Sequence, residues 1–349
     1  MKTMGGRAVV LGGYGAVGSE VVHLLADGSR RILVAGRDEP RARALAGTVP
    51  GAVPASIEVN RPDSVREVVS TDDLVINCTG VESISLAWSI IESEAHYLDI
   101  SASQDHLAAL AVLDETAVSR QRTILCSVGL APGLTNLFVA DLHHRYPGTR
   151  PIEVTVVLGL GDDYGAASQT WTLARIGTSF PDPGDGRPVG NFREGRRVVF
   201  PAGFGRRRAY RFGLADQHVL TRDLQRPVVT RLAFDPAFVT RFAAVGSRLP
   251  ALARAIAQVA RRLPVTRIGT AWFAARVEVR GGPFHWGVGH SQSHGTAVVA
   301  ARAVRLFDEG EPTPGLQHLH NLTTLLEVRD DLRDAGILTT THPRGDFQV

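Results

Sequence analysis

The stretch RAVVLGGYGAVG, residues 7–18, decides the architecture of the first half of the chain. Its apolar start predicts a short buried strand, and its glycines fit the pattern G-x-G-x-x-G. A helical stretch at 19–26 and a second apolar run at 31–35 follow. Glycines in such a turn let the backbone approach a pyrophosphate at the helix N-terminus. The cofactor-binding positions predicted here are Gly13, Tyr14, Gly15, Val17 and Gly18.

Apolar runs and helical stretches keep alternating after this unit. Strands are expected at 7–11, 31–35, 56–59, 74–77, 97–100 and 123–127. Such alternation predicts an α/β Rossmann fold, a doubly wound parallel sheet with right-handed crossovers. Ligands bind beyond the carboxyl ends of these strands. Three residues that follow strand ends, Asn60, Thr79 and Ser101, are therefore further cofactor candidates.

The end of the second strand indicates which dinucleotide binds. NAD-specific folds place an acidic residue there, roughly 20 residues after the glycines, to hold the ribose 2′-hydroxyl. Here Arg37 stands at that place, with Arg41 and Arg43 close by. A guanidinium can hold a 2′-phosphate, so we expect NADP. Asp38 leaves NAD open as the alternative.

The second half of the chain has a different pattern. Strands are expected at 152–160, 197–200, 228–234 and 271–280, without regularly alternating helices. Consecutive strands of this kind predict a second domain with a mixed or antiparallel sheet. Arginines gather at 193, 196, 197 and 206–208 among apolar residues, which fits either a solvated sheet face or a docking surface for an anionic substrate or acidic carrier protein.

Composition excludes several classes of protein. The only lysine among 349 residues is Lys2, so a pyridoxal Schiff base, a P-loop lysine and a Tyr-x-x-x-Lys proton relay are all excluded. Cys78 and Cys126 have no metal-ligand spacing, and no metal site is expected. No apolar run is long enough for a membrane span, and the net charge of +3 does not demand nucleic-acid binding. These features predict a cytoplasmic protein.

Several motifs together resemble the saccharopine dehydrogenase-like NAD(P)-binding reductase family. They are the glycine turn, the strand end YLDIS at 97–101, the loop GLAPGLTN at 129–136, and the late helix from Thr296 followed by Pro314-Gly315. The resemblance implies a Rossmann domain at 1–133, an inserted α+β substrate or dimerisation domain at 134–287, and C-terminal helices at 288–349 that return to the Rossmann domain. It specifies fold and cofactor better than substrate.

No motif in the sequence identifies the residues that donate a proton or contact the substrate, so these candidates are chosen by residue type and position. His290 lies near the start of a predicted helix and could donate a proton, since an imidazole titrates near neutral pH. Asp163 and Tyr164 follow a strand and are the other catalytic candidates, although Asp163 could simply cap a helix. Pro132, Gly133 and His294 are expected to contact the substrate.

Together these observations predict an NADP-dependent oxidoreductase that reduces a C=N or C=C bond of a small or carrier-bound metabolite. Two alternatives stay open: a catalytically silent NADP-binding sensor or scaffold, and an epimerase or cyclase that retains its cofactor. Two copies could pair through the sheet of the second domain, giving a homodimer.

Overall fold

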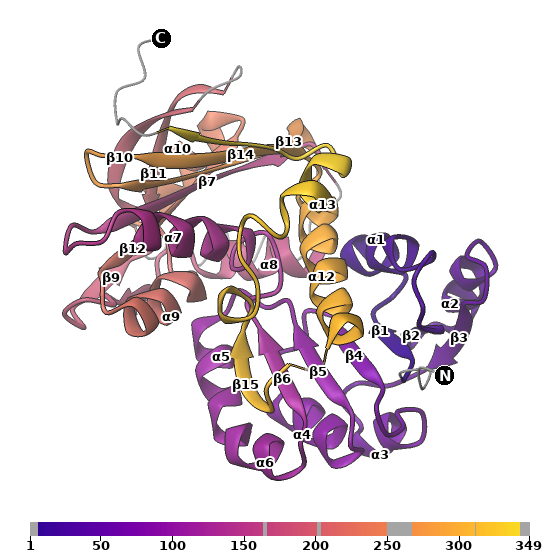
Figure 1. Ribbon diagram of the computed structural model, residues 1–349. Helices are drawn as coiled ribbons and strands as arrows, with labels where there is room; N and C mark the ends of the chain where they lie inside the picture. The colour runs from indigo at the N-terminus through magenta and orange to yellow at the C-terminus, as the bar shows by residue number, and fades with distance from the viewer. Residues whose placement is uncertain (1–5, 163–165, 201–203, 250–266, 311, 343–349) are drawn as a thin grey trace. The chain divides into compact units, whose positions relative to one another are not determined.

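The computed structural model describes residues 6–162, 166–200, 204–249, 267–310 and 312–342 (Figure 1). The chain divides into two compact units. Unit 1 comprises Met1–Gly133 and Thr296–Thr323, and unit 2 comprises Leu134–Gly295 and Thr324–Val349. Helix α12 (Gln292–Glu309) carries the chain from unit 2 into unit 1.

Unit 1 is built on a seven-stranded parallel sheet in the order β15-β6-β5-β4-β1-β2-β3. The strands are β1 (Ala8–Leu11), β2 (Ile32–Gly36), β3 (Val53–Ser56), β4 (Leu74–Asn77), β5 (His96–Asp99), β6 (Thr123–Cys126) and β15 (Gly315–His318). Most are fully buried, which is why they read as continuous apolar runs. The strand order reverses between β1 and β4, and this confirms the predicted doubly wound fold.

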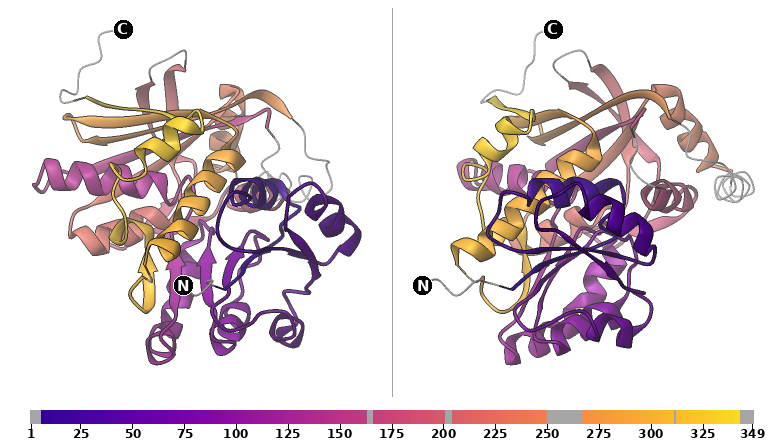
Figure 2. Two further views of the ribbon diagram at one scale, coloured as in Figure 1. Left: turned by 45° about the vertical axis from the view of Figure 1, so that its right-hand side comes forward. Right: turned by 90° about the vertical axis from the view of Figure 1, so that its right-hand side faces the viewer.

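Short helices alternate with the strands of unit 1 (Figure 2). They are α1 (Ala16–Leu24), α2 (Glu39–Ala46), α3 (Pro62–Arg66), α4 (Ile84–Glu92), α5 (Gln104–Leu110), η1 (Ala111–Leu113), α6 (Asp114–Ser119) and, after β15, η2 (Leu319–Asn321). A Ser or Asp side chain caps three of them: Asp38 on α2, Ser83 on α4 and Ser103 on α5.

Unit 2 contains a mixed sheet in the order β10-β11-β12-β7-β13-β14-β16, in which only β7 and β12 are parallel. Its strands are β7 (Ile152–Leu160), β10 (Arg193–Phe200), β11 (Gly205–Arg211), β12 (Val228–Asp235), β13 (Ile268–Val279), β14 (Phe284–His290) and β16 (Leu338–His342). A separate hairpin joins β8 (Ser179–Pro181) to β9 (Pro188–Gly190). Among the described residues of unit 2, the helices are α7 (Leu134–Arg145), α8 (Ala166–Ala174), α9 (Ala215–Leu224), α10 (Ala237–Gly246) and α13 (Arg329–Asp334).

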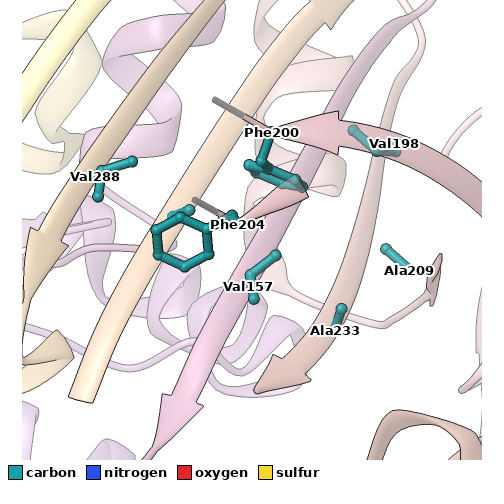
Figure 3. Close-up of a cluster of buried hydrophobic side chains, with 8 residues drawn as sticks. Val157, Val198, Phe200, Phe204, Ala209, Ala233 and Val288 are labelled. Carbon is teal, nitrogen blue, oxygen red and sulfur yellow. The ribbon is translucent and has the colours of Figure 1, made fainter. Parts of the chain in front are cut away.

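Alternation along the strands gives the unit 2 sheet two different faces. Helices α7 and α9 cover one of them, where Asp141 of α7 contacts His285 and Asp216 of α9 contacts Thr230. The opposite face carries its own apolar cluster (Figure 3). The cluster consists of Val157, Val198, Phe200, Phe204, Ala209, Ala233, Ala274 and Val288.

The C-terminal segment differs from the expected division. Residues 288–349 were expected to return as helices to the first domain, but only Thr296–Thr323 belong to unit 1. Residues from Thr324 onward belong to unit 2, because β16 pairs with β14 over Phe284–Val288. The segment also contains two strands, β15 and β16, that the sequence pattern did not indicate.

Candidate cofactor site

The glycine turn between β1 and α1 is closed by backbone hydrogen bonds. The N–H groups of Gly12 and Gly13 both donate to the Ala35 carbonyl, at 2.8 and 3.1 Å. A Cβ added at Gly18 would lie 2.2 Å from the Gly12 carbonyl oxygen, so only glycine fits there. At Gly15, by contrast, an added Cβ would meet only that oxygen, at 3.1 Å. The side of the turn at Gly15 is therefore open to a ligand.

Helix α1 begins at this open side. Gly15 is its N-cap, and no side chain caps the helix. Free N–H groups at a helix N-terminus, together with the helix dipole, attract an anion. The turn has the small residues and the donors that a pyrophosphate requires. Val17 lies half-buried in the first turn of the helix.

Tyr14 joins this turn to the end of β2. Its ring occupies the space beside Gly36, where an added Cβ would be 2.5 Å from the ring. Its hydroxyl accepts a hydrogen bond from the Asp38 N–H at 2.9 Å. The Arg41 guanidinium lies 4.7 Å from the ring centroid and donates to the Tyr14 carbonyl at 3.3 Å. Tyr14 therefore holds an arginine beside the glycine turn.

The predicted 2′-phosphate residues lie at the same corner. Arg37 is exposed directly after β2. The Asp38 carboxylate accepts from the Arg41 N–H at 3.0 Å, because Asp38 is the N-cap of α2. The Asp38 carboxylate therefore caps α2, while the guanidinium groups of Arg37 and Arg41 are exposed nearby. Asn60, in the turn after β3, is exposed and contacts Glu58 at 3.4 Å.

Thr79 follows β4 in a loop that Asn77 holds. The Asn77 Oδ1 accepts from the Thr79 hydroxyl at 2.6 Å, and its Nδ2 donates to the Val81 carbonyl at 3.0 Å. The Thr79 hydroxyl in turn accepts from the Val81 N–H at 3.0 Å. These bonds fix the loop at the carboxyl end of a central strand, next to the point where the strand order reverses.

Asp99 is a buried polar centre that sequence reasoning missed. It accepts from the Tyr97 hydroxyl at 2.5 Å, from His106 at 3.0 Å and from the Ser101 N–H at 2.6 Å. Burial opposes protonation of His106, but the hydrogen bond and charge of Asp99 outweigh it and raise the pKa of the imidazole. Burial and the charge of Asp99 also raise the pKa of the Tyr97 phenol well above its usual value.

The same network positions Ser101. Its backbone is held by Asp99, and its hydroxyl donates to Glu82 at 3.2 Å. Glu82 belongs to the loop that follows β4. The structure thus brings the two predicted residues Thr79 and Ser101 to adjacent loops at one edge of the sheet.

The loop after β6 is tightly folded. Gly133 has a φ of 138°, and an added Cβ would lie 1.9 Å from the Gly129 carbonyl oxygen. The peptide bond before Pro132 is cis. Beside this loop, the Ser127 hydroxyl lies 3.0 Å from Nδ1 of His318, at the end of β15. His318 and His320 stack with ring centroids 5.8 Å apart, and neither was among the predicted site residues.

Strand β14 carries two histidines in different surroundings. His285 and His290 lie on opposite faces of β14, because side chains alternate along a strand. His285 is buried between Asp141 at 2.7 Å and Thr341 at 2.8 Å. Burial lowers its pKa, and Asp141 only partly offsets this. His290 ends the strand, exposed, with its ring 5.3 Å from that of Trp272.

Of the remaining predicted residues, the structure describes His294 but not Asp163 or Tyr164. His294 lies in the first turn of α12, where its N–H donates to the Ser291 hydroxyl at 3.1 Å. Asp163 and Tyr164 lie outside the described residues. Within the residues that the structure describes, no three His, Cys, Asp or Glu side chains are grouped so that they could hold a metal.

The N-terminal part of the chain is similar to a family of known proteins. Residues 8–124 match the profile of the family described as "Saccharopine dehydrogenase NADP binding domain". This part of the chain is similar to the NADP-binding domain of saccharopine dehydrogenases. The domain spans β1 to the start of β6 and includes the glycine turn, Arg37 and Arg41. NADP, the expected cofactor, is confirmed.

The fold of the whole chain is similar to that of a solved enzyme. Saccharopine dehydrogenase (L-Glu forming) from Saccharomyces cerevisiae matches with a TM-score of 0.67 at 14% identity, covering 97% of this chain and 100% of that one. A short-chain type dehydrogenase/reductase from Mycobacterium marinum matches 35% of this chain and 73% of its own, at 15% identity and a TM-score of 0.30. No curated protein sequence matches significantly.

These findings support an NADP-dependent oxidoreductase with a saccharopine dehydrogenase-like fold. Among the described helices, none is both long and apolar enough to cross a membrane.

Proposed function

We propose that the chain reduces a C=N or C=C bond of a small or carrier-bound metabolite with NADPH. The observation that carries the proposal is the open glycine turn with two exposed arginines beside it, within a matched NADP-binding domain. The yeast enzyme of similar fold is named as a dehydrogenase of saccharopine. Its name supports the reaction class, and we leave the substrate open.

Each residue of the cofactor site has a proposed role. Gly13, Gly15 and Gly18, with Val17 in the same helical turn, admit the pyrophosphate, while Tyr14 shields one side of it. Arg37 and Arg41 hold the 2′-phosphate by charge-assisted hydrogen bonds. Asn60 contacts the adenine half. Thr79 and Ser101 bound the nicotinamide half, since both follow central strands of the sheet. When bound, NADPH supplies the hydride.

The substrate and proton-donor roles rest on the sequence pattern. Pro132 and Gly133 are proposed to shape the substrate floor, with His294 as a further contact. His290 is the proposed proton donor, supported by its exposure at the end of β14. Asp163 and Tyr164 are the other candidates. His290→Asn should lower turnover by about 10²–10⁴-fold, the usual contribution of a general acid.

Substrate screening with NADPH tests the function. We expect one class of unsaturated metabolite to cause oxidation of NADPH, followed by the loss of nicotinamide absorbance. NADPH binding without oxidation by any substrate class would favour a silent sensor. Turnover of a substrate without net nucleotide consumption would favour an epimerase or cyclase. A cytoplasmic location and a homodimer belong to the same proposal, and ultracentrifugation measures the second.

A further inference from the structure

Helix α10 exposes a row of large apolar side chains. Phe238, Phe242, Val245 and Leu249 are 50%, 68%, 52% and 52% exposed. Leu249 follows the helix in a continuing turn, because its N–H donates to the Gly246 carbonyl at 3.0 Å. At 3.6 residues per turn, the spacing of these four residues places them on one side of the helix. The rings of Phe238 and Phe242 meet edge to face, with centroids 6.2 Å apart.

The opposite side of α10 already forms the contact with the rest of unit 2. Thr240, Ala243 and Ala244 are buried there, and the helix packs against β11 and β12. The Thr240 hydroxyl accepts from the Phe234 N–H at 2.7 Å. The outward row is therefore not needed to hold the helix in place. A helix that is apolar on both sides normally has both sides covered, and a contiguous exposed apolar patch indicates an interaction site.

Positive charge borders the apolar row. Arg241 and Arg248 are exposed on one flank of it, and α10 contains no acidic residue. Residues 134–295 hold 22 arginines and no lysine against 11 acidic residues, a net charge of +11 in a chain whose total is +3. This segment makes up most of unit 2.

The hairpin beside α10 adds to this charge. Arg193 of β10 donates to the Ser247 carbonyl at 2.7 Å, directly after the helix. On the same hairpin, Arg197, Arg206 and Arg208 are exposed and form no ion pair within the described part of the chain. Arg196 and Arg207, by contrast, are held by ion pairs to Glu278 at 2.7 Å and Asp235 at 3.1 Å.

We propose that the outer face of α10 binds an anionic lipid surface. Its apolar row would enter the boundary between headgroups and acyl chains, and Arg241 and Arg248 would contact lipid phosphates, as in interfacial amphipathic helices. A second copy of the chain is a poorer occupant, because the exposed arginines would repel their counterparts in the other copy. The face is defined by Phe238, Phe242, Val245 and Leu249, and it does not depend on the proposed reaction.

Vesicle sedimentation of the full-length protein tests the proposal. We expect binding to vesicles of phosphatidylcholine mixed with phosphatidylglycerol, weaker binding to phosphatidylcholine alone, and loss of binding at high salt. Phe242→Ser should weaken binding about tenfold, since one large side chain no longer enters the lipid. Leu326→Ser is the matched control, because Leu326 is 63% exposed elsewhere in unit 2.

The arginines are tested in the same way. The double variant Arg241→Gln, Arg248→Gln should lose most of the preference for phosphatidylglycerol, and Arg333→Gln, an exposed arginine paired with Asp330, should not. Unchanged thermal unfolding of the variants shows that they are folded. Absence of vesicle binding, or equal binding by Phe242→Ser, overturns the proposal. Self-association that Phe242→Ser abolishes would also overturn the proposal, because it would assign the face to a second copy of the chain. Retention on an acidic polypeptide without vesicle binding would overturn it as well.

Discussion

The Nε2 of His106 lies 3.0 Å from Oδ2 of Asp99, and both side chains are almost completely buried. The carboxylate also accepts from Tyr97 and from the Ser101 backbone, so it holds the loop after β5 through three separate groups. Asn77, which organises the neighbouring loop, donates to the Tyr97 hydroxyl at 2.9 Å. One buried ion pair therefore orders both loops assigned to the nicotinamide half of the cofactor.

Removing His106 should leave the Asp99 charge buried without its cation. We expect His106→Gln to lower the free energy of unfolding by about 3–5 kcal/mol at pH 6, the usual cost of breaking a buried pair. The pKa of His106 is raised in the folded state, so the pair stabilises fully below the unfolded pKa of about 6.5 and loses this contribution as pH rises through the folded pKa.

Urea unfolding at pH 6 and pH 9 measures this effect. The difference between the natural protein and His106→Gln should shrink at the higher pH, whereas His144→Gln, at an exposed histidine, should change little at either pH. An equal loss of stability at both pH values would show that the imidazole contributes by packing alone.

Replacing Asp216 should stabilise the protein, whereas replacing His106 should destabilise it. Burial raises its pKa to about 6, although it accepts from the Thr230 hydroxyl at 2.9 Å and the Gln217 N–H at 2.7 Å. The unfolded carboxyl titrates near pH 3.9, so the stability that this group contributes is complete below that pH and is lost as pH rises toward 6. Asp216→Asn should remove this loss and raise the free energy of unfolding by about 2–3 kcal/mol at pH 8.

Chemical denaturation across pH 4–8 tests the assignment. The profile of Asp216→Asn should be flatter than that of the natural protein, and Asp185→Asn, whose side chain is 62% exposed, should leave the profile unchanged. A natural protein whose stability does not fall over this range would refute the raised pKa.

The sequence predicted those parts of the fold whose pattern lies within a short stretch of the chain. The strand, glycine turn and helix at residues 8–24 follow each other directly, and the steric demands at Gly18 can be inferred from spacing alone. Strand β15 gave no such signal, because it joins the sheet only through pairing with β6, far earlier in the chain. In β14, two glycines interrupt the alternation of apolar side chains, so no strand is predicted there.

The same distinction applies to the site. Arg37 and Tyr14 were indicated because their roles depend on position within one βαβ unit. The contact between Ser127 and His318 joins residues 191 positions apart, and the pair of Asp99 and His106 depends on how a loop folds after β5. Neither spacing is typical of a motif, so only three-dimensional geometry reveals these pairs.

The two glycines of the turn should respond differently to substitution. Gly15→Val places its side chain on the open side of the turn, so NADPH binding should be lost while the protein stays folded. Gly18→Val forces a side chain into the Gly12 backbone and should destabilise the domain itself. Calorimetric titration with NADPH and thermal unfolding separate the two effects. Full NADPH affinity in a folded Gly15→Val protein would place the pyrophosphate elsewhere.

Cofactor selectivity tests the arginines after β2. If Arg37 and Arg41 hold the 2′-phosphate, Arg37→Asp and Arg41→Ser should each weaken NADPH binding about ten- to hundredfold, the scale of a charge-assisted hydrogen bond. NADH, which lacks that phosphate, should bind these variants no more weakly than it binds the natural protein. Arg43→Ser is the control, because Arg43 lies on the same helix but pairs with Glu39. Fluorescence titration of both nucleotides measures the ratio, and parallel losses for NADPH and NADH would mean that these arginines do not recognise the phosphate.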